Sequence, residues 1–81
     1  MIDYKAKIER IRQALGDRVK IAKGASIVRF THGSGTYRGK KGYAIRVQTS
    51  LPYGQVVSEK TIGFGDDFDA ALADAARKAG A

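Results

Sequence analysis

The residues best suited to chemistry in this sequence are its cations, and they are concentrated in the middle of the chain. The 81 residues include 15 Lys and Arg against 8 Asp and Glu, which gives a formal net charge of +7. No acidic residue occurs between Arg18 and Ser58. The basic residues of this stretch are Arg18, Lys20, Lys23, Arg29, Arg38, Lys40, Lys41 and Arg46. Positive charge gathered in this way indicates a polyanionic partner.

A glycine-rich stretch over residues 33–42 invites comparison with phosphate-binding loops, but its spacing excludes the known ones. A P-loop has four residues between its glycines, whereas five separate Gly33 from Gly39 here. The dinucleotide-binding fingerprint fails because Arg38 occupies the position of its third glycine. We interpret residues 31–42 as a mobile basic hairpin loop, the alternative being a solvated loop with no contacts. The cations that could contact phosphates from this loop are Arg38, Lys40 and Lys41.

Groups for catalysis or metal binding are sparse. The chain has no cysteine and one histidine, His32, which we predict to be an exposed polar residue of the loop rather than a general base. Asp66, Asp67 and Asp69 resemble paired carboxylates, but capping of a following helix explains them more simply. We therefore expect no enzymatic activity, no metal site and no cofactor.

Two helices are predicted from apolar residues that recur with a helical period. The first spans residues 3–15, within an N-terminal segment 1–16 that Gly16 ends in a left-handed conformation. The second spans residues 68–79, after Asp66 or Asp67 as its cap. Its many alanines have little side-chain bulk, so this helix could lie very close to a sheet.

Strands are predicted between the helices, where apolar and polar residues alternate over residues 25–30, 43–48 and 56–64. Val19 and Ile21 would form a short fourth strand. The short connections indicate an antiparallel meander. The expected fold class is α+β, with a three-stranded or four-stranded antiparallel sheet packed on the C-terminal helix and an additional N-terminal helix. We expect one domain over residues 1–81, with its sheet-plus-helix core in residues 24–79.

Alternation also predicts which side chains share a face of the sheet. Arg29, Arg46 and Gln48 fall on one face, to which Thr31 and Lys60 are added from the neighbouring positions. The apolar residues Val28, Phe30, Tyr43, Ile45 and Val47 fall on the other face, where we expect the alanine-rich helix. Arginine and glutamine on a sheet can enter the major groove of DNA and bind the edges of guanine and adenine.

The segments Tyr43-Ala44-Ile45-Arg46-Val47, Lys60-Thr61-Ile62-Gly63-Phe64 and Phe68-Asp69-Ala70-Ala71-Leu72-Ala73 resemble the Apetala-type (ethylene-response-factor) DNA-binding domain. Relatives of that family are the arm-binding N-terminal domains of phage and transposon integrases. The resemblance covers residues 24–79, although Tyr43 stands where the family usually has tryptophan. It implies that Arg29, Thr31, Arg46, Gln48 and Lys60 face DNA, and that the chain is a phage or mobile-element protein.

The sequence is compatible with three functions. The leading expectation is binding of double-stranded DNA. RNA or a single strand is an alternative, because Tyr37, Tyr43 and Tyr53 could stack on bases. A third is a small phage-type protein that docks on an acidic host protein, and the first helix could also pair with another copy of the chain. Without a long apolar run or a signal-peptide pattern, we expect a cytoplasmic protein with no membrane partner.

Overall fold

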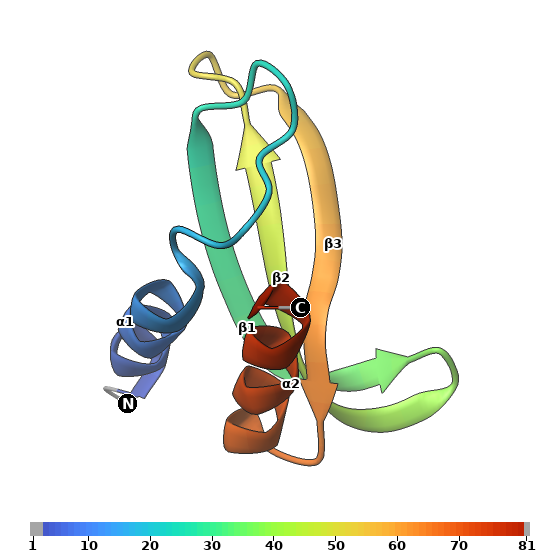
Figure 1. Ribbon diagram of the computed structural model, residues 1–81. Helices are drawn as coiled ribbons and strands as arrows, with labels where there is room; N and C mark the ends of the chain where they lie inside the picture. Colours follow the sequence, from blue (N-terminus) through green and yellow to red (C-terminus); the bar gives the residue numbers. More distant parts are fainter. Residues whose placement is uncertain (1–2, 81) are drawn as a thin grey trace.

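The computed structural model describes residues 3–80, in which three strands lie between two helices (Figure 1). The elements are α1 (Asp3–Leu15), β1 (Ile27–Tyr37), β2 (Lys40–Ser50), β3 (Val56–Gly65) and α2 (Phe68–Gly80). The strands form one antiparallel sheet in the order β1-β2-β3, which confirms the α+β class and the meander. The fourth strand predicted at Val19 is wrong, because residues 16–26 form no strand. Neither described helix is long and apolar enough to cross a membrane.

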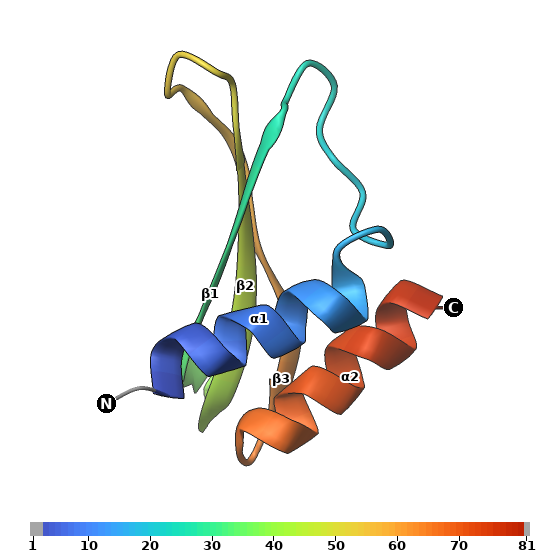
Figure 2. The same ribbon diagram turned by 90° about the vertical axis from the view of Figure 1, so that its left-hand side faces the viewer.

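Both helices pack on the same side of the sheet, across its lower half in Figure 2. We call this side the helix side and the other the open face. The buried residues that form the core are Ile11, Leu15, Phe30, Ile45, Val47, Phe68, Ala71 and Ala75, with Val28 and Tyr43 partly buried beside them. The apolar sheet face therefore packs against α2 as predicted, and α1 completes the same core.

α2 lies close against β3, as its alanine content suggested. A Cβ atom on Gly63 would lie 2.4 Å from the carbonyl oxygen of Ala71 and 2.6 Å from the Cβ of Ala75. A Cβ on Gly65 would lie 2.6 Å from the Cβ of Ala70. Strand backbone and helix backbone are thus in direct contact, and only glycine on the strand permits this separation.

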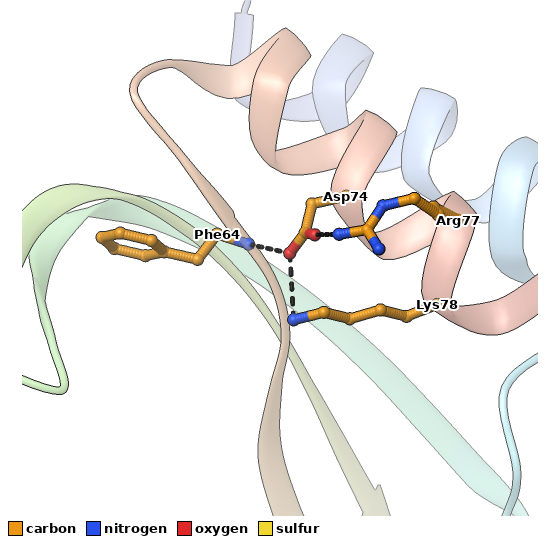
Figure 3. A network of polar contacts seen from close by, with 4 residues as sticks. All are labelled: Phe64, Asp74, Arg77 and Lys78. Carbon is orange, nitrogen blue, oxygen red and sulfur yellow. Dashed lines mark hydrogen bonds and ion pairs between the residues drawn. The ribbon is translucent and has the colours of Figure 1, made fainter.

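Asp74 joins α2 to the outer edge of the sheet (Figure 3). Its Oδ2 atom accepts a hydrogen bond from the Phe64 amide at 3.1 Å and lies 3.1 Å from Nζ of Lys78, while Oδ1 pairs with Arg77. Burial alone would raise the pKa of Asp74, but the hydrogen bonds from Phe64, Lys78 and Arg77 outweigh it and lower that pKa. The carboxylate therefore satisfies an amide of an edge strand, which would otherwise lack a partner.

α1 has the predicted bounds and α2 ends one residue later than predicted, at Gly80, while the conformation at the end of α1 differs from the prediction. Oδ1 of Asp67 accepts a hydrogen bond from the amide of Ala70 at 2.8 Å, so Asp67 is the N-cap of α2. Gly16 follows the last residue of α1, but its φ is not positive, so the predicted left-handed stop is wrong. Its amide binds the carbonyl of Arg12 at 2.8 Å, and a Cβ there would lie 2.6 Å from that oxygen. Close backbone contact is the reason for glycine at this position.

The segment predicted as a loop over residues 31–42 is instead the far part of a long β-hairpin. β1 and β2 pair without interruption from Ile27↔Ser50 to Tyr37↔Lys40. Arg38 (φ 53°) and Gly39 (φ 81°) form the two-residue turn. Two consecutive positive φ angles are the mark of a type I′ turn, whose twist suits a hairpin. Glycines weaken strand propensity, but this turn sets the register and the ladder continues through them.

The end of this hairpin extends beyond the rest of the sheet, to the right in Figure 1. β3 pairs with β2 only from Tyr43 onward, so residues 35–42 form a two-stranded projection that we call the distal ribbon. Cβ atoms added to Gly35 and Gly39 would meet no atom within 4 Å. The ribbon is therefore open around Gly35 and Gly39.

Candidate nucleic-acid interface

The open face carries four of the predicted contact residues as one block. Arg29 pairs with Gln48, and Thr31 pairs with Arg46, across the β1–β2 ladder. Directly opposed residues and alternate positions of a strand project from the same face. Arg29, Thr31 and Arg46 are exposed, and Gln48 is half-buried. The structure therefore brings these four residues together on one surface, as alternation predicted; we call them the open-face block.

A shallow hollow in the open face lies beside Arg46. Its lining comes from Thr31, His32, Gly33, Ser34, Ala44 and Arg46. Gly33 is exposed, and a Cβ there would meet no atom within 4 Å, so the backbone of β1 is accessible at this position. A flat group placed next to Arg46 could therefore approach the sheet closely.

Glu59 of β3 adjoins the block and was not assigned to it from the sequence. It pairs directly with Gln48, whose Nε2 donates a hydrogen bond to Oε2 of Glu59 at 3.1 Å. Because a carboxylate only accepts, this contact orients the Gln48 amide and leaves its Oε1 as an acceptor. The negative charge also offsets part of the charge of Arg29 and Arg46. Only the cross-strand register, which alternation alone does not supply, could have revealed this contact.

Lys60 lies on the helix side, so its predicted placement beside Arg46 is wrong. It pairs with Val47, whose side chain is buried in the core, and it lines a cavity together with Leu15 and Ala75. The polar run from Glu59 to Thr61 gives no alternation from which the face could be read. The β2–β3 ladder also contains two register shifts, which move successive residues of β3 relative to β2.

The three cations predicted to contact phosphates lie at the tip of the distal ribbon, and all are exposed. Lys40 pairs with Tyr37 and Lys41 pairs with Thr36, so alternation puts Lys40 on the open face and Lys41 on the reverse. The guanidinium carbon of Arg38 lies 5.3 Å from the centre of the Tyr37 ring. The ribbon thus presents positive charge on both of its surfaces.

An aromatic pair lies where the distal ribbon leaves the sheet. The rings of Tyr37 and Phe64 are 5.5 Å apart at a tilt of 39°. Phe64 pairs with Ala44, which places it on the open face. Gly42 makes room for it, because a Cβ there would lie 2.6 Å from Cζ of Phe64. Sequence reasoning did not assign Phe64 to the site.

His32 belongs to β1 and is half-buried on the helix side, so the exposed loop position predicted for it is wrong. Its ring stacks on Tyr4 at 4.6 Å and on Tyr43 at 5.7 Å, and Nδ1 is hydrogen-bonded to the Tyr43 hydroxyl. Burial, and then the charge of Lys7, lower the pKa of His32. Tyr43 is occupied in this cluster, which removes it from the tyrosines that could stack on a base.

Comparison with known proteins found no match to any family model, curated protein or solved structure. No family is therefore identified, and the established architecture is a three-stranded antiparallel sheet with helices on one side. Within residues 3–80, no three His, Cys, Asp or Glu side chains are grouped so that they could hold a metal ion.

Proposed function

We propose that this chain binds double-stranded DNA by placing the open face of its sheet in the major groove. The observation that carries the proposal is the open-face block, in which Arg29, Thr31, Arg46 and Gln48 project together from a sheet surface that neither helix covers. The major groove is about 12 Å wide and admits a two-stranded ribbon. Arginine donates to O6 and N7 of guanine, and glutamine binds N6 and N7 of adenine.

Arg46 is the principal base-reading residue in this proposal. It lies in the central strand and pairs with Thr31 on one side and Thr61 on the other, so its backbone is held from both sides. The hollow beside it leaves room for the edge of a base. The guanidinium is planar by its own bonding and can make a bidentate contact with guanine, and the paired backbone fixes the point of the sheet from which it extends.

The distal ribbon supplies the sequence-independent part of binding. Arg38, Lys40 and Lys41 stand beyond the end of β3, where they can meet the phosphates that flank the groove. Phosphate contacts fix register and orientation, whereas contacts with base edges specify sequence. Lys60 lies on the helix side and is therefore not among the proposed DNA contacts.

The resemblance to the Apetala-type domain supports the same orientation, since in that family an arginine-bearing second strand and an alanine-rich helix lie on opposite sides of the sheet. β2 with Arg46 and α2 with Ala71 and Ala75 correspond to that arrangement. We extend the proposal to a role in a phage or mobile element on this resemblance alone.

The test is fluorescence anisotropy with a duplex, a single-stranded DNA and an RNA of one sequence, each titrated over a range of salt. We expect the duplex to bind most tightly. Three phosphate contacts from the ribbon give a slope of log affinity against log salt of about −3, at roughly 0.9 per contact. A slope near zero, or no binding of the duplex at low salt, refutes the proposal and leaves an acidic protein surface as the partner.

A single-stranded nucleic acid is the second candidate, favoured by the Tyr37–Phe64 pair on the open face. Aromatic rings stack on unpaired bases of any sequence. Tyr37→Ala separates the two candidates. If a single strand is the target, this variant weakens binding of the single strand by about 1–3 kcal/mol, whereas duplex binding through Arg46 changes little.

A further inference from the structure

A second candidate binding site lies on the helix side of the sheet, where a cavity of about 320 Å³ opens between the last turns of the two helices, residues 18–20 and β3. The apolar part of the lining, which we call the floor, consists of Leu15, Val19, Ile62, Ala75 and Ala79, and Thr61 also contributes to the lining. The rim carries four cations, which are Arg18, Lys20, Lys60 and Lys78. Across the described part of the chain, no carboxylate contributes to the lining.

Two of these four cations lie near negative charge within the described residues. Nζ of Lys78 lies 3.1 Å from Asp74. A guanidinium nitrogen of Arg18 lies near Gly80, since a Cβ there would be 3.8 Å away. The C-terminal end of a helix carries partial negative charge, so Arg18 lies beside the partial negative charge at the end of α2. Lys20 and Lys60 form no ion pair with any carboxylate of residues 3–80. An apolar hollow thus adjoins two cations whose charge nothing in the described chain neutralises.

We propose that this cavity binds a small amphiphilic anion, meaning an apolar chain or ring that carries one carboxylate or phosphate. The apolar body covers Val19, Ile62 and Ala79, which are partly exposed, and the head group is bound by Lys20 and Lys60. Sites for small molecules have volumes of roughly 300–1,000 Å³, with mostly apolar linings and a few polar groups that fix orientation. The cavity, at about 320 Å³, suits a ligand at the small end of that range.

Charge and size together select this ligand class. One carboxylate or phosphate head group offers two or more oxygens, to which two unpaired lysines can both bind, and a neutral ligand would leave the repulsion between the lysines in place. The apolar floor would gain nothing from a small inorganic anion, since its contribution depends on apolar area removed from water. The site lies on the opposite side of the sheet from the open-face block, so the proposal of an amphiphile site does not depend on the proposal of DNA binding.

The test is an NMR titration of the ¹⁵N-labelled full chain with octanoate and with octyl phosphate. Octanol, which lacks the charge, and acetate, which lacks the chain, serve as controls. We expect saturable shifts at the amides of Val19, Lys60 and Ile62 with both amphiphiles, and binding of octanol and acetate weaker by about fivefold or more. The tighter of the two amphiphiles identifies the head group.

The combined variant Lys20→Gln/Lys60→Gln tests the assigned cations. The variant lacks both proposed ion pairs between the octanoate carboxylate and the lysines, and octanoate binding should weaken about fivefold to tenfold. The matched control, Lys5→Gln/Lys23→Gln, removes the same charge from exposed positions outside the cavity and should leave the affinity within about twofold. Unchanged melting temperatures verify that both variants are folded. Octanol binding as tightly as octanoate, equal losses in the two double variants, or the absence of saturable shifts would overturn the proposal; the last result would leave an acidic protein segment as the occupant.

Discussion

Replacing Gly63 with alanine tests the contact on which the position of α2 depends. The new Cβ would lie 2.4 Å from the carbonyl oxygen of Ala71, 2.6 Å from the Cβ of Ala75 and 2.9 Å from its amide nitrogen. Optimal separations between nonbonded carbon atoms are about 3.5–4.0 Å, so α2 would have to move away from β3 by about 1 Å. Two of the three atoms belong to helix backbone and cannot rotate aside.

Overpacking a core in this way costs typically about 1–3 kcal/mol, and we expect the upper half of that range. For a domain of this size each kcal/mol lowers the melting temperature by about 4–8 °C, so Gly63→Ala should melt roughly 10–20 °C below the wild type. Thermal unfolding followed by circular dichroism measures this. Gly35→Ala is the matched control, because its Cβ would meet no atom within 4 Å and its effect should stay within about 1 kcal/mol. Equal melting temperatures for the two variants would refute the close approach of α2 to β3.

Three further predictions concern pH, the β3 edge and the distal ribbon. The pKa of His32 is lowered from 6.5 in the folded chain, so the unfolded chain binds the imidazole proton more tightly. The free energy of unfolding should therefore fall as pH falls from about 6.5 through the lowered pKa. His32→Phe should remove this pH dependence between pH 5 and 7, a range in which no other type of side chain present in this sequence has its ordinary pKa. Asp74→Ala should cost about 1–3 kcal/mol in urea unfolding because the Phe64 amide loses its acceptor; an unchanged midpoint would show that water replaces the carboxylate. Lys40→Ala/Lys41→Ala should weaken binding to all duplexes alike and reduce the salt slope by about 2, one for each lysine that no longer binds a phosphate, whereas an unchanged slope would exclude both lysines from the phosphate backbone.

The two helices and the faces of β1 and β2 could be predicted because their signals are local. The spacing of Ile11 and Leu15 and the capping by Asp67 depend only on neighbours along the chain. Strict alternation around Phe30 and Ile45 likewise determines which side chains are buried. These signals also sufficed to place Arg29, Thr31, Arg46 and Gln48 on one surface.

The features that could not be predicted depend on pairing between distant segments. Lys60 and Glu59 are assigned to faces by register shifts in the β2–β3 ladder, which no pattern within β3 reveals. His32 is half-buried because α1 brings Tyr4 against it, a contact between separate elements. The strands of the distal ribbon give no strand pattern in the sequence because glycines are poor strand formers, although the dipeptide Arg38-Gly39 can form a two-residue hairpin turn.

The proposed function depends most on Arg46 reading bases from the open face, and one comparison tests this directly. Arg46→Ala and Lys60→Ala each remove one positive charge from the sheet, on opposite sides of it. Both are titrated with a duplex selected from a random pool by the wild type and with a scrambled duplex. We predict that Arg46→Ala loses about 1–3 kcal/mol on the selected duplex, roughly fivefold to 150-fold in Kd, and little on the scrambled one. Lys60→Ala should weaken both duplexes slightly and equally. Equal losses on the two duplexes for Arg46→Ala, or the same profile for both variants, would contradict base reading by the open face.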